Sequence, residues 1–147
     1  MGLRIFLDAD VLIAAFQGES LLRECAQAIL SEPLFDFVYD PLLRMEVMIQ
    51  PTYHRHTIEV AFYNTYFKNA MCFGQLNQMF EIGSKDAMDN GIAVVDALHI
   101  ASAHLSKCAA LVTAEKPTKP MFRTSLVKVV SILGVARPTS ALQLLSK

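Results

Sequence analysis

Residues 3–10 of this chain read LRIFLDAD, a short strand-like run followed by two acids. Asp8 directly follows the run, and Asp10 stands two positions later. Open α/β sheets bind ligands beyond the carboxyl ends of their strands, so an acid that closes a strand lies at the mouth of a site. Two acids at this spacing indicate a metal ion or a phosphoryl group as the ligand.

The rest of the chain alternates between strand-like and helical patterns. Apolar and β-branched runs predict strands at residues 3–7, 35–39, 109–113 and 126–132. Periodic apolar positions predict helices at residues 9–16, 20–31, 41–50, 57–73, 76–89, 94–107 and 138–145. Asp40 and Pro41 form a helix-start signal, and Pro51 is expected to end that helix. The alternation predicts an α/β fold with one domain over residues 1–147, an α/β/α sandwich around a central, mostly parallel sheet.

Composition narrows the class of protein. The 147 residues fit one domain, and a hydrophobic content of 53% suffices for a core. No apolar run approaches the roughly 18 residues of a membrane helix, and aspartates stand where a signal peptide would be apolar, so we expect a soluble, cytoplasmic protein. The 3 cysteines are widely spaced, which disfavours a disulfide framework or a zinc site. The net charge of −1 means that any nucleic-acid contact must come from a local basic patch.

Glu46 lies on an otherwise apolar helix face. Leu42 and Ile49 are its neighbours one turn away on the helix predicted over residues 41–50. An unpaired buried carboxylate costs several kcal/mol, so Glu46 needs a cation or a metal ion. The alternative is a glutamate at the edge of the face that reaches solvent and pairs with Arg44 or Arg55.

Two further acids stand at suggestive positions. Asp96 lies in the first turn of a helix, where the helix dipole alone favours an acid. It nevertheless shares a face with Ile100 on a helix that is apolar nearly all round, so it is expected to point into the protein or a cleft. Glu115 follows the strand 109–113 and is either an ordinary loop acid or, beside Thr113, part of the sheet mouth.

These acids come from distant segments. Hard divalent cations need several oxygen ligands, which no single segment of this chain supplies. If the acids converged, their like charges would raise one another's pKa values unless a metal ion neutralised them. The acids that could converge are Asp8, Glu46, Asp96 and Glu115.

Four segments, in order, carry a resemblance to a known family. Residues 6–13 (FLDADVLI) match a first-strand motif that usually reads Asp-Thr-Asn followed by apolar residues, and Glu46 lies in an early helix. Residues 96–101 (DALHIA) match a third acidic motif, and residues 112–115 (VTAE) match a fourth, usually Thr-x-Asp or Thr-x-Asn. Over nearly its whole length the chain resembles a PIN domain, the nuclease fold of VapC-type toxin ribonucleases.

The resemblance implies an endoribonuclease that uses Mg²⁺ or Mn²⁺ to cleave single-stranded RNA phosphodiesters. It implies a set of catalytic and metal-binding acids, namely Asp8, Glu46, Asp96 and Glu115. Asp8 and Asp96 are the leading metal ligands, and Glu46 either binds the metal or orients the water. Asp10 stands where the family usually has Asn and is expected, with Thr113, to support the ligands from behind. Glu115 is longer than the usual Asp and is expected to act through water.

The basic loop after Glu115 and the aromatic stretch within 57–73 are the candidate surfaces for substrate and partner contacts. Lys116, Lys119 and Arg123 make the loop after Glu115 basic and suited to RNA phosphates, unless they form only a solvated loop. Aromatic residues within 57–73 could stack bases but are expected to pack a core or a dimer interface, and His99 and His104 are expected to be packed or surface residues. An antitoxin protein and a second copy of the chain in a homodimer are the expected protein partners.

Two other functions compete with the ribonuclease. Leu7-Asp8-Ala9-Asp10-Val11 also resembles the Asp-x-Asp strand end of haloacid-dehalogenase phosphohydrolases, in which Asp8 would be a covalent nucleophile. The later metal motif of that family is missing, and the chain is short for its fold. A PIN-like scaffold that only binds a partner or RNA is the third alternative, which the altered fourth motif allows.

Overall fold

A parallel sheet forms the centre of the molecule. In the computed structural model, which describes residues 2–146, the strand order is β3-β2-β1-β4-β5 and every neighbouring pair is parallel. The strands are β1 (Leu3–Leu7), β2 (Phe35–Tyr39), β3 (Met71–Cys72), β4 (Ala110–Thr113) and β5 (Val129–Ser131). Because they run in one direction, their carboxyl ends meet at one edge of the sheet.

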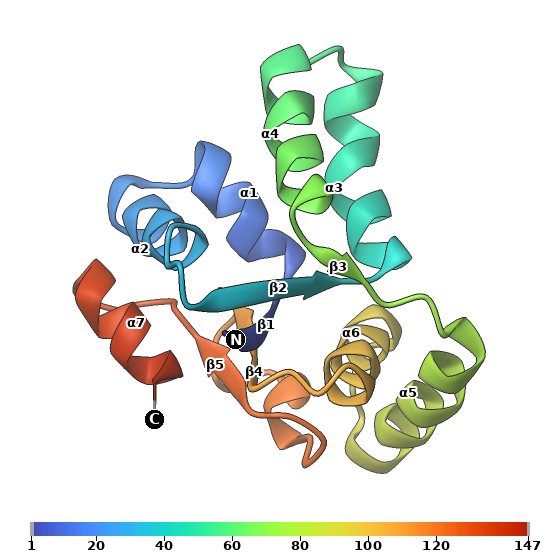
Figure 1. Ribbon diagram of the computed structural model, residues 1–147. Helices are drawn as coiled ribbons and strands as arrows, with labels where there is room; N and C mark the ends of the chain where they lie inside the picture. Colours follow the sequence, from blue (N-terminus) through green and yellow to red (C-terminus); the bar gives the residue numbers. More distant parts are fainter. Residues whose placement is uncertain (1, 147) are drawn as a thin grey trace.

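Helices cover both faces of this sheet (Figure 1). On one side lie α1 (Ala9–Gln17) and α2 (Ser20–Leu30), and on the other lie α5 (Leu76–Asn90) and α6 (Val94–Leu105). A hairpin of α3 (Pro41–Tyr53) and α4 (Thr57–Lys68) projects beyond the sheet. The chain finishes with the short 3-10 helix η1 (Pro120–Arg123) and α7 (Pro138–Leu145), which packs on α2. The predicted α/β/α sandwich is confirmed.

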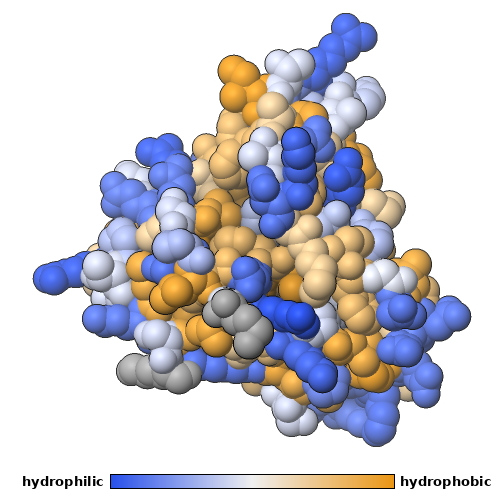
Figure 2. All heavy atoms as spheres, viewed as in Figure 1, coloured by the Kyte–Doolittle hydropathy of each residue, from blue (hydrophilic) through white to orange (hydrophobic). Residues whose placement is uncertain are grey.

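The core is built around β1. Ile5, Phe6 and Leu7 are fully buried because β1 has a strand on each side and helices over both faces. Aromatic residues of α4 also serve this core, as expected from their spacing; Tyr63, Tyr66 and Phe67 are all buried. A space-filling view nevertheless shows apolar side chains among the charged ones at the surface (Figure 2). Within residues 2–146, none of the helices is both long and apolar enough to cross a bilayer.

Helix α3 continues past Pro51, where the sequence predicted its end. Proline removes one helical hydrogen bond, but the amides that follow can still use carbonyls of the preceding turn. The amide of His54 donates to the carbonyl of Gln50 at 3.0 Å, and that of His56 donates to the carbonyl of Pro51 at 2.8 Å. Pro51 is also buried. The predicted boundary was wrong because packing and these bonds carry the helix to Tyr53.

The predicted helix 57–73 also differs from the structure. It ends at Lys68, and Met71–Cys72 instead form β3, which pairs with Val38 and Tyr39 of β2. A strand of two residues is too short to show an alternating pattern, so only its partner strand reveals it.

Two elements are shorter than predicted. The helix expected over 94–107 ends at Leu105, since Lys107 has a φ of 61°, which a right-handed helix excludes. Within the predicted strand 126–132, residues Val129–Ser131 pair with β4. The amide of Leu126 is held by the Thr124 hydroxyl at 3.1 Å and does not enter the ladder.

Candidate active site

Strand β1 delivers Asp8 to the carboxyl edge of the sheet. The amide of Ala9, in the first turn of α1, donates to Asp8 Oδ1 at 2.9 Å, and the Thr113 hydroxyl at the end of β4 donates to Oδ2 at 3.1 Å. Asp8 is 7% exposed. Burial, and after it the negative charge of Asp10, raise the pKa of Asp8 to about 7, although His99 acts in the opposite direction. This carboxylate is therefore fixed in place but poorly neutralised.

Asp10 joins α1 to the loop after β4. The amide of Ala114 donates to Asp10 Oδ1 at 3.0 Å, and Thr113 Oγ1 lies 3.1 Å from Asp10 Oδ2. The Thr113 hydroxyl has a single proton, so it can donate to Asp8 or to Asp10 but not to both at once. Burial raises the pKa of Asp10 as well. Asp10 thus shares the Thr113 hydroxyl with Asp8 and connects α1 to the loop after β4.

A second hydrogen-bonded chain runs through His99 of α6. His99 is 1% exposed, and its ring lies between Asp40, with Nδ1 2.8 Å from Oδ2, and Glu46, with Nε2 2.5 Å from Oε1. Asp40 follows β2 and caps α3 by accepting from the amide of Leu43 at 2.9 Å. The Ser102 hydroxyl also donates to Asp40, at 2.9 Å. The carboxyl end of β2 and the helix α6 are thereby tied to Glu46.

The charge of His99 follows from its neighbours. Burial by itself lowers its pKa, but the hydrogen bonds to Asp40 and Glu46 outweigh burial and raise the pKa to about 10. Burial acts in the opposite direction on an acid and would raise the pKa of Asp40. The hydrogen bond from His99 outweighs burial, so the pKa of Asp40 is lowered. His99 is therefore an imidazolium near neutral pH, with both N–H groups donating.

Glu46 points from α3 toward this histidine. One of its oxygens is held by His99. Because the side chain is 38% exposed, the carboxylate still reaches the solvent. The pairing with Arg44 that the sequence allowed is not formed, because the Arg44 guanidinium lies 5.5 Å from the centre of the Phe67 ring. Within residues 2–146, Arg55 forms no ion pair with Glu46 either.

Asp96 and Glu115 lie around the same space. Burial raises the pKa of Asp96, and the charges of Glu115 and Glu46 raise it further, while those of His99 and Lys119 lower it. Among residues 2–146, no protein group donates a hydrogen bond to Asp96. Glu115 is 40% exposed and lies 3.7 Å from the Lys119 ammonium. The four acids predicted from the sequence therefore influence one another electrostatically.

The donor set fits a hard divalent cation. Asp8, Glu46 and His99 present atoms that all lie within 4.8 Å of one another. Because His99 is a cation with both ring nitrogens occupied, we assign it as the donor that orients Glu46, leaving carboxylate oxygens as ligands. Oxygen ligands are those that Mg²⁺ and Mn²⁺ prefer. A bound cation would also relieve the unfavourable burial of Asp8 and Asp96.

The basic residues of the loop after Glu115 have different surroundings. Lys119 pairs with Glu115, and Lys116 is exposed. Arg123 instead donates to the carbonyl of Asn90 at 3.1 Å, at the end of α5. These lysines flank the acids, while Arg123 also serves as a structural brace.

Sequence reasoning missed how His99, Asp40 and Ser102 act together. It expected His99 to be a packed or surface residue and Asp40 to be a helix cap, and both descriptions are right as far as they go. One signal was available: Asp40 directly follows a parallel strand, as Asp8 does. Its partner could not be inferred, because His99 lies 59 residues away along the chain.

Several solved structures are similar in fold to this chain. A toxin-antitoxin complex from Klebsiella pneumoniae has a TM-score of 0.66 at 20% identity, covering 86% of this chain and 96% of that chain. VapBC2 from Rickettsia felis, solved with a DNA fragment from its promoter, has a TM-score of 0.67 at 10% identity, covering 87% and 98%. A protein from Pyrobaculum aerophilum has a TM-score of 0.56 at 15% identity, covering 100% and 98%. At these identities the likeness is one of fold.

The family match is independent of these superpositions. A search of curated proteins gives no significant match. The sequence profile of the PIN domain matches residues 5–117, which include Asp8, Glu46, Asp96 and Glu115. The chain belongs to the PIN domain family.

Proposed function

We propose that this chain is a metal-dependent endoribonuclease that cleaves single-stranded RNA and acts as the toxin of a toxin-antitoxin pair. PIN domains are generally nucleases, and PIN nucleases typically use divalent metals. The observation that carries the proposal is the convergence of Asp8, a buried carboxylate at the end of β1, with Glu46 and His99, whose candidate ligand atoms all lie within 4.8 Å of one another. Membership of the PIN family also argues against the haloacid-dehalogenase alternative.

The acids have complementary parts in this proposal. Asp8, Asp96, Glu46 and Glu115 would hold Mg²⁺ or Mn²⁺. When bound, such an ion makes a water more acidic and offsets negative charge that develops on the phosphodiester. His99 holds one oxygen of Glu46, which leaves the other oxygen either to bind the metal ion or to orient the water. The Thr113 hydroxyl keeps the Asp8 carboxylate from rotating.

The low exposure of Asp8 supports a single-stranded RNA substrate. Asp8 is 7% exposed, so a flexible strand can bring its phosphate to this carboxylate more easily than a stiff duplex can. Lys116 and Lys119 beside Glu115 supply positive charge for the RNA backbone despite the net charge of −1.

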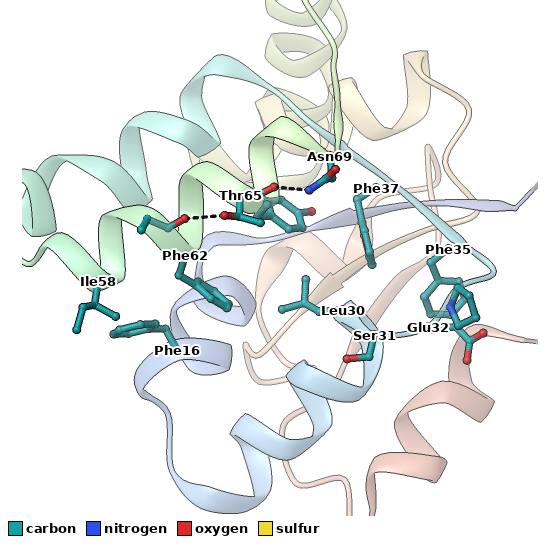
Figure 3. Close-up of a pocket in the computed structure, with 13 residues that line it drawn as sticks. Phe16, Leu30, Ser31, Glu32, Phe35, Phe37, Ile58, Phe62, Thr65 and Asn69 are labelled. Carbon is teal, nitrogen blue, oxygen red and sulfur yellow. Dashed lines mark hydrogen bonds between the residues drawn. The ribbon is translucent and has the colours of Figure 1, made fainter.

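An apolar groove supports an antitoxin partner (Figure 3). It has a volume of about 650 Å³ and is lined by aromatic residues that include Phe16, Phe37 and Phe62. Phe16 and Ile58 also line a neighbouring cleft that reaches Glu59. We propose that an apolar segment of an antitoxin fills the groove, as such segments fill grooves in many complexes. One of the similar structures is named as a toxin-antitoxin complex, and another as VapBC2 bound to promoter DNA.

The direct test is calorimetric titration of Mn²⁺ into the wild type and Asp96→Asn, beside cleavage of a mixed panel of single-stranded RNAs. We expect the wild type to bind Mn²⁺ and to cleave at least one RNA, and Asp96→Asn to lose most of both. Asp89→Asn, which alters an exposed aspartate paired with Lys85, is the matched control and should behave as the wild type. A wild type that binds no Mn²⁺ would refute the proposal.

A further inference from the structure

A cleft lined by several polar residues lies next to the acids, between α1 and the α3/α4 hairpin. It has a volume of about 300 Å³, and both Glu46 and Glu59 line it. Gln17, Gln50 and two histidines complete its polar lining. Because Glu46 belongs to the candidate active site, a substrate bound there through its phosphate can extend a neighbouring group into this cleft.

Glu59 is the buried charge of the cleft. It is 7% exposed, although the residues on both sides of it in the chain, Ile58 and Val60, are more accessible. Its Oε2 accepts from the buried Tyr63 hydroxyl at 2.7 Å and faces Gln17 Nε2 at 3.5 Å. Its Oε1 has a weaker partner, His56 Nδ1 at 3.6 Å, which is beyond a normal hydrogen bond. Oε1 can therefore accept from a ligand.

Two exposed histidine rings and Gln17 accompany Glu59. The rings of His54 and His56 lie 5.8 Å apart at an angle of 30°, and both residues are exposed. Imidazole rings of this kind can stack on unpaired bases. Gln17 holds Glu59 Oε2 only through a long contact of 3.5 Å, so both oxygens of this carboxylate keep a lone pair that a ligand can use.

We propose that this cleft is a base-recognition subsite that selects guanine next to the cleaved phosphate. Guanine carries two adjacent donors, N1–H and the N2 amino group, on its Watson–Crick edge, which match the two oxygens of the Glu59 carboxylate. Adenine, cytosine and uracil each place an acceptor next to a donor on that edge, so an acceptor of these bases would face a carboxylate oxygen. The inference rests on the proposed ribonuclease function, because it assigns the substrate of the same site.

The test uses Glu59→Gln, which preserves shape. The glutamine carbonyl can still accept from the Tyr63 hydroxyl, while its amide replaces Oε1 with a donor. Binding of GMP, AMP, CMP and UMP is followed by NMR of the histidine ring signals, and cleavage positions are mapped on random single-stranded RNA. We expect the wild type to bind GMP at least tenfold more tightly than the others and to cleave beside guanine, and Glu59→Gln to lose both preferences. Glu24→Gln, an exposed glutamate of α2, should keep them.

The outcomes separate the subsite from the ribonuclease function. A wild type that cleaves RNA without preferring guanine, or a Glu59→Gln variant that keeps the preference, overturns the subsite and leaves the nuclease standing. A wild type that prefers GMP but cleaves no RNA supports the subsite and refutes the nuclease. If Glu59→Gln weakens binding of an arginine-bearing peptide and leaves nucleotide preference unchanged, Glu59 belongs to a peptide partner and the subsite is overturned.

Discussion

Replacing Asp8 by asparagine should stabilise the metal-free protein. The pKa of Asp8 is raised from 3.8 to about 7, chiefly by burial and then by Asp10. The folded state therefore holds the Asp8 proton more tightly than the unfolded state does. As pH rises from about 4 to about 7, the unfolded state releases this proton and is stabilised, whereas the folded state still holds it. The free energy of unfolding therefore falls over that range and then levels off.

The size of the effect follows from this shift. The pKa of Asp8 is about 3 units higher in the folded state than in the unfolded state. Each unit corresponds to 1.36 kcal/mol, which gives an upper limit of roughly 4 kcal/mol at pH 8. Asparagine caps a helix about as well as aspartate, so the bond from Ala9 should survive. Its amide can donate to Thr113, whose hydroxyl then donates to Asp10. We therefore expect a gain of about 2 kcal/mol, or roughly 4–8 °C in melting temperature for a domain of this size.

Thermal unfolding in EDTA, measured from pH 4 to pH 8, provides the assay. Asp8→Asn should melt above the wild type at pH 8, and the difference should shrink toward pH 4. With saturating Mn²⁺ the order should reverse, because the wild type gains about 2.7 kcal/mol at a hundredfold excess over Kd. Glu24→Gln controls for the loss of an exposed carboxylate. A metal-free Asp8→Asn that melts at or below the wild type at pH 8 would show that burial and the charge of Asp10 do not destabilise the ionised Asp8 carboxylate.

The remaining predictions concern supporting residues. His99→Gln should lower the free energy of unfolding by about 3–5 kcal/mol, because it leaves the buried Asp40 charge uncompensated, and should weaken Mn²⁺ binding by about 10–100-fold. Urea unfolding would measure the first effect and calorimetry the second. Unchanged values would show that His99 does not support the site. Thr113→Val keeps the side-chain shape but removes the donor to Asp8, and should cost about 1–2 kcal/mol in urea unfolding at pH 8. Gly91→Ala should lower the melting temperature by about 2–4 °C, since Gly91 ends α5 with a φ of 68° that favours glycine, and an unchanged value would contradict this reason.

Most of the fold was accessible from local patterns. The apolar run before Asp8 defined β1, and the Asp40-Pro41 pair marked the start of α3. These signals depend on residues within one or two turns of each other, which is why single-sequence reasoning finds them. The end of α3 was missed because Pro51 is accommodated by packing, which the local pattern does not contain.

The sequence by itself also singled out the candidate acids of the site. Asp8 and Glu115 could be placed at strand ends, and Glu46 and Asp96 on apolar helix faces, because burial and periodicity are properties of short segments. The tertiary structure alone decided how these acids are held. The contact of His99 with Asp40 and Glu46 joins segments more than 50 residues apart, and it depends on the order in which β2, β1 and β4 pair. Local sequence cannot specify such partners, since a buried charge is satisfied by whichever group the fold brings to it.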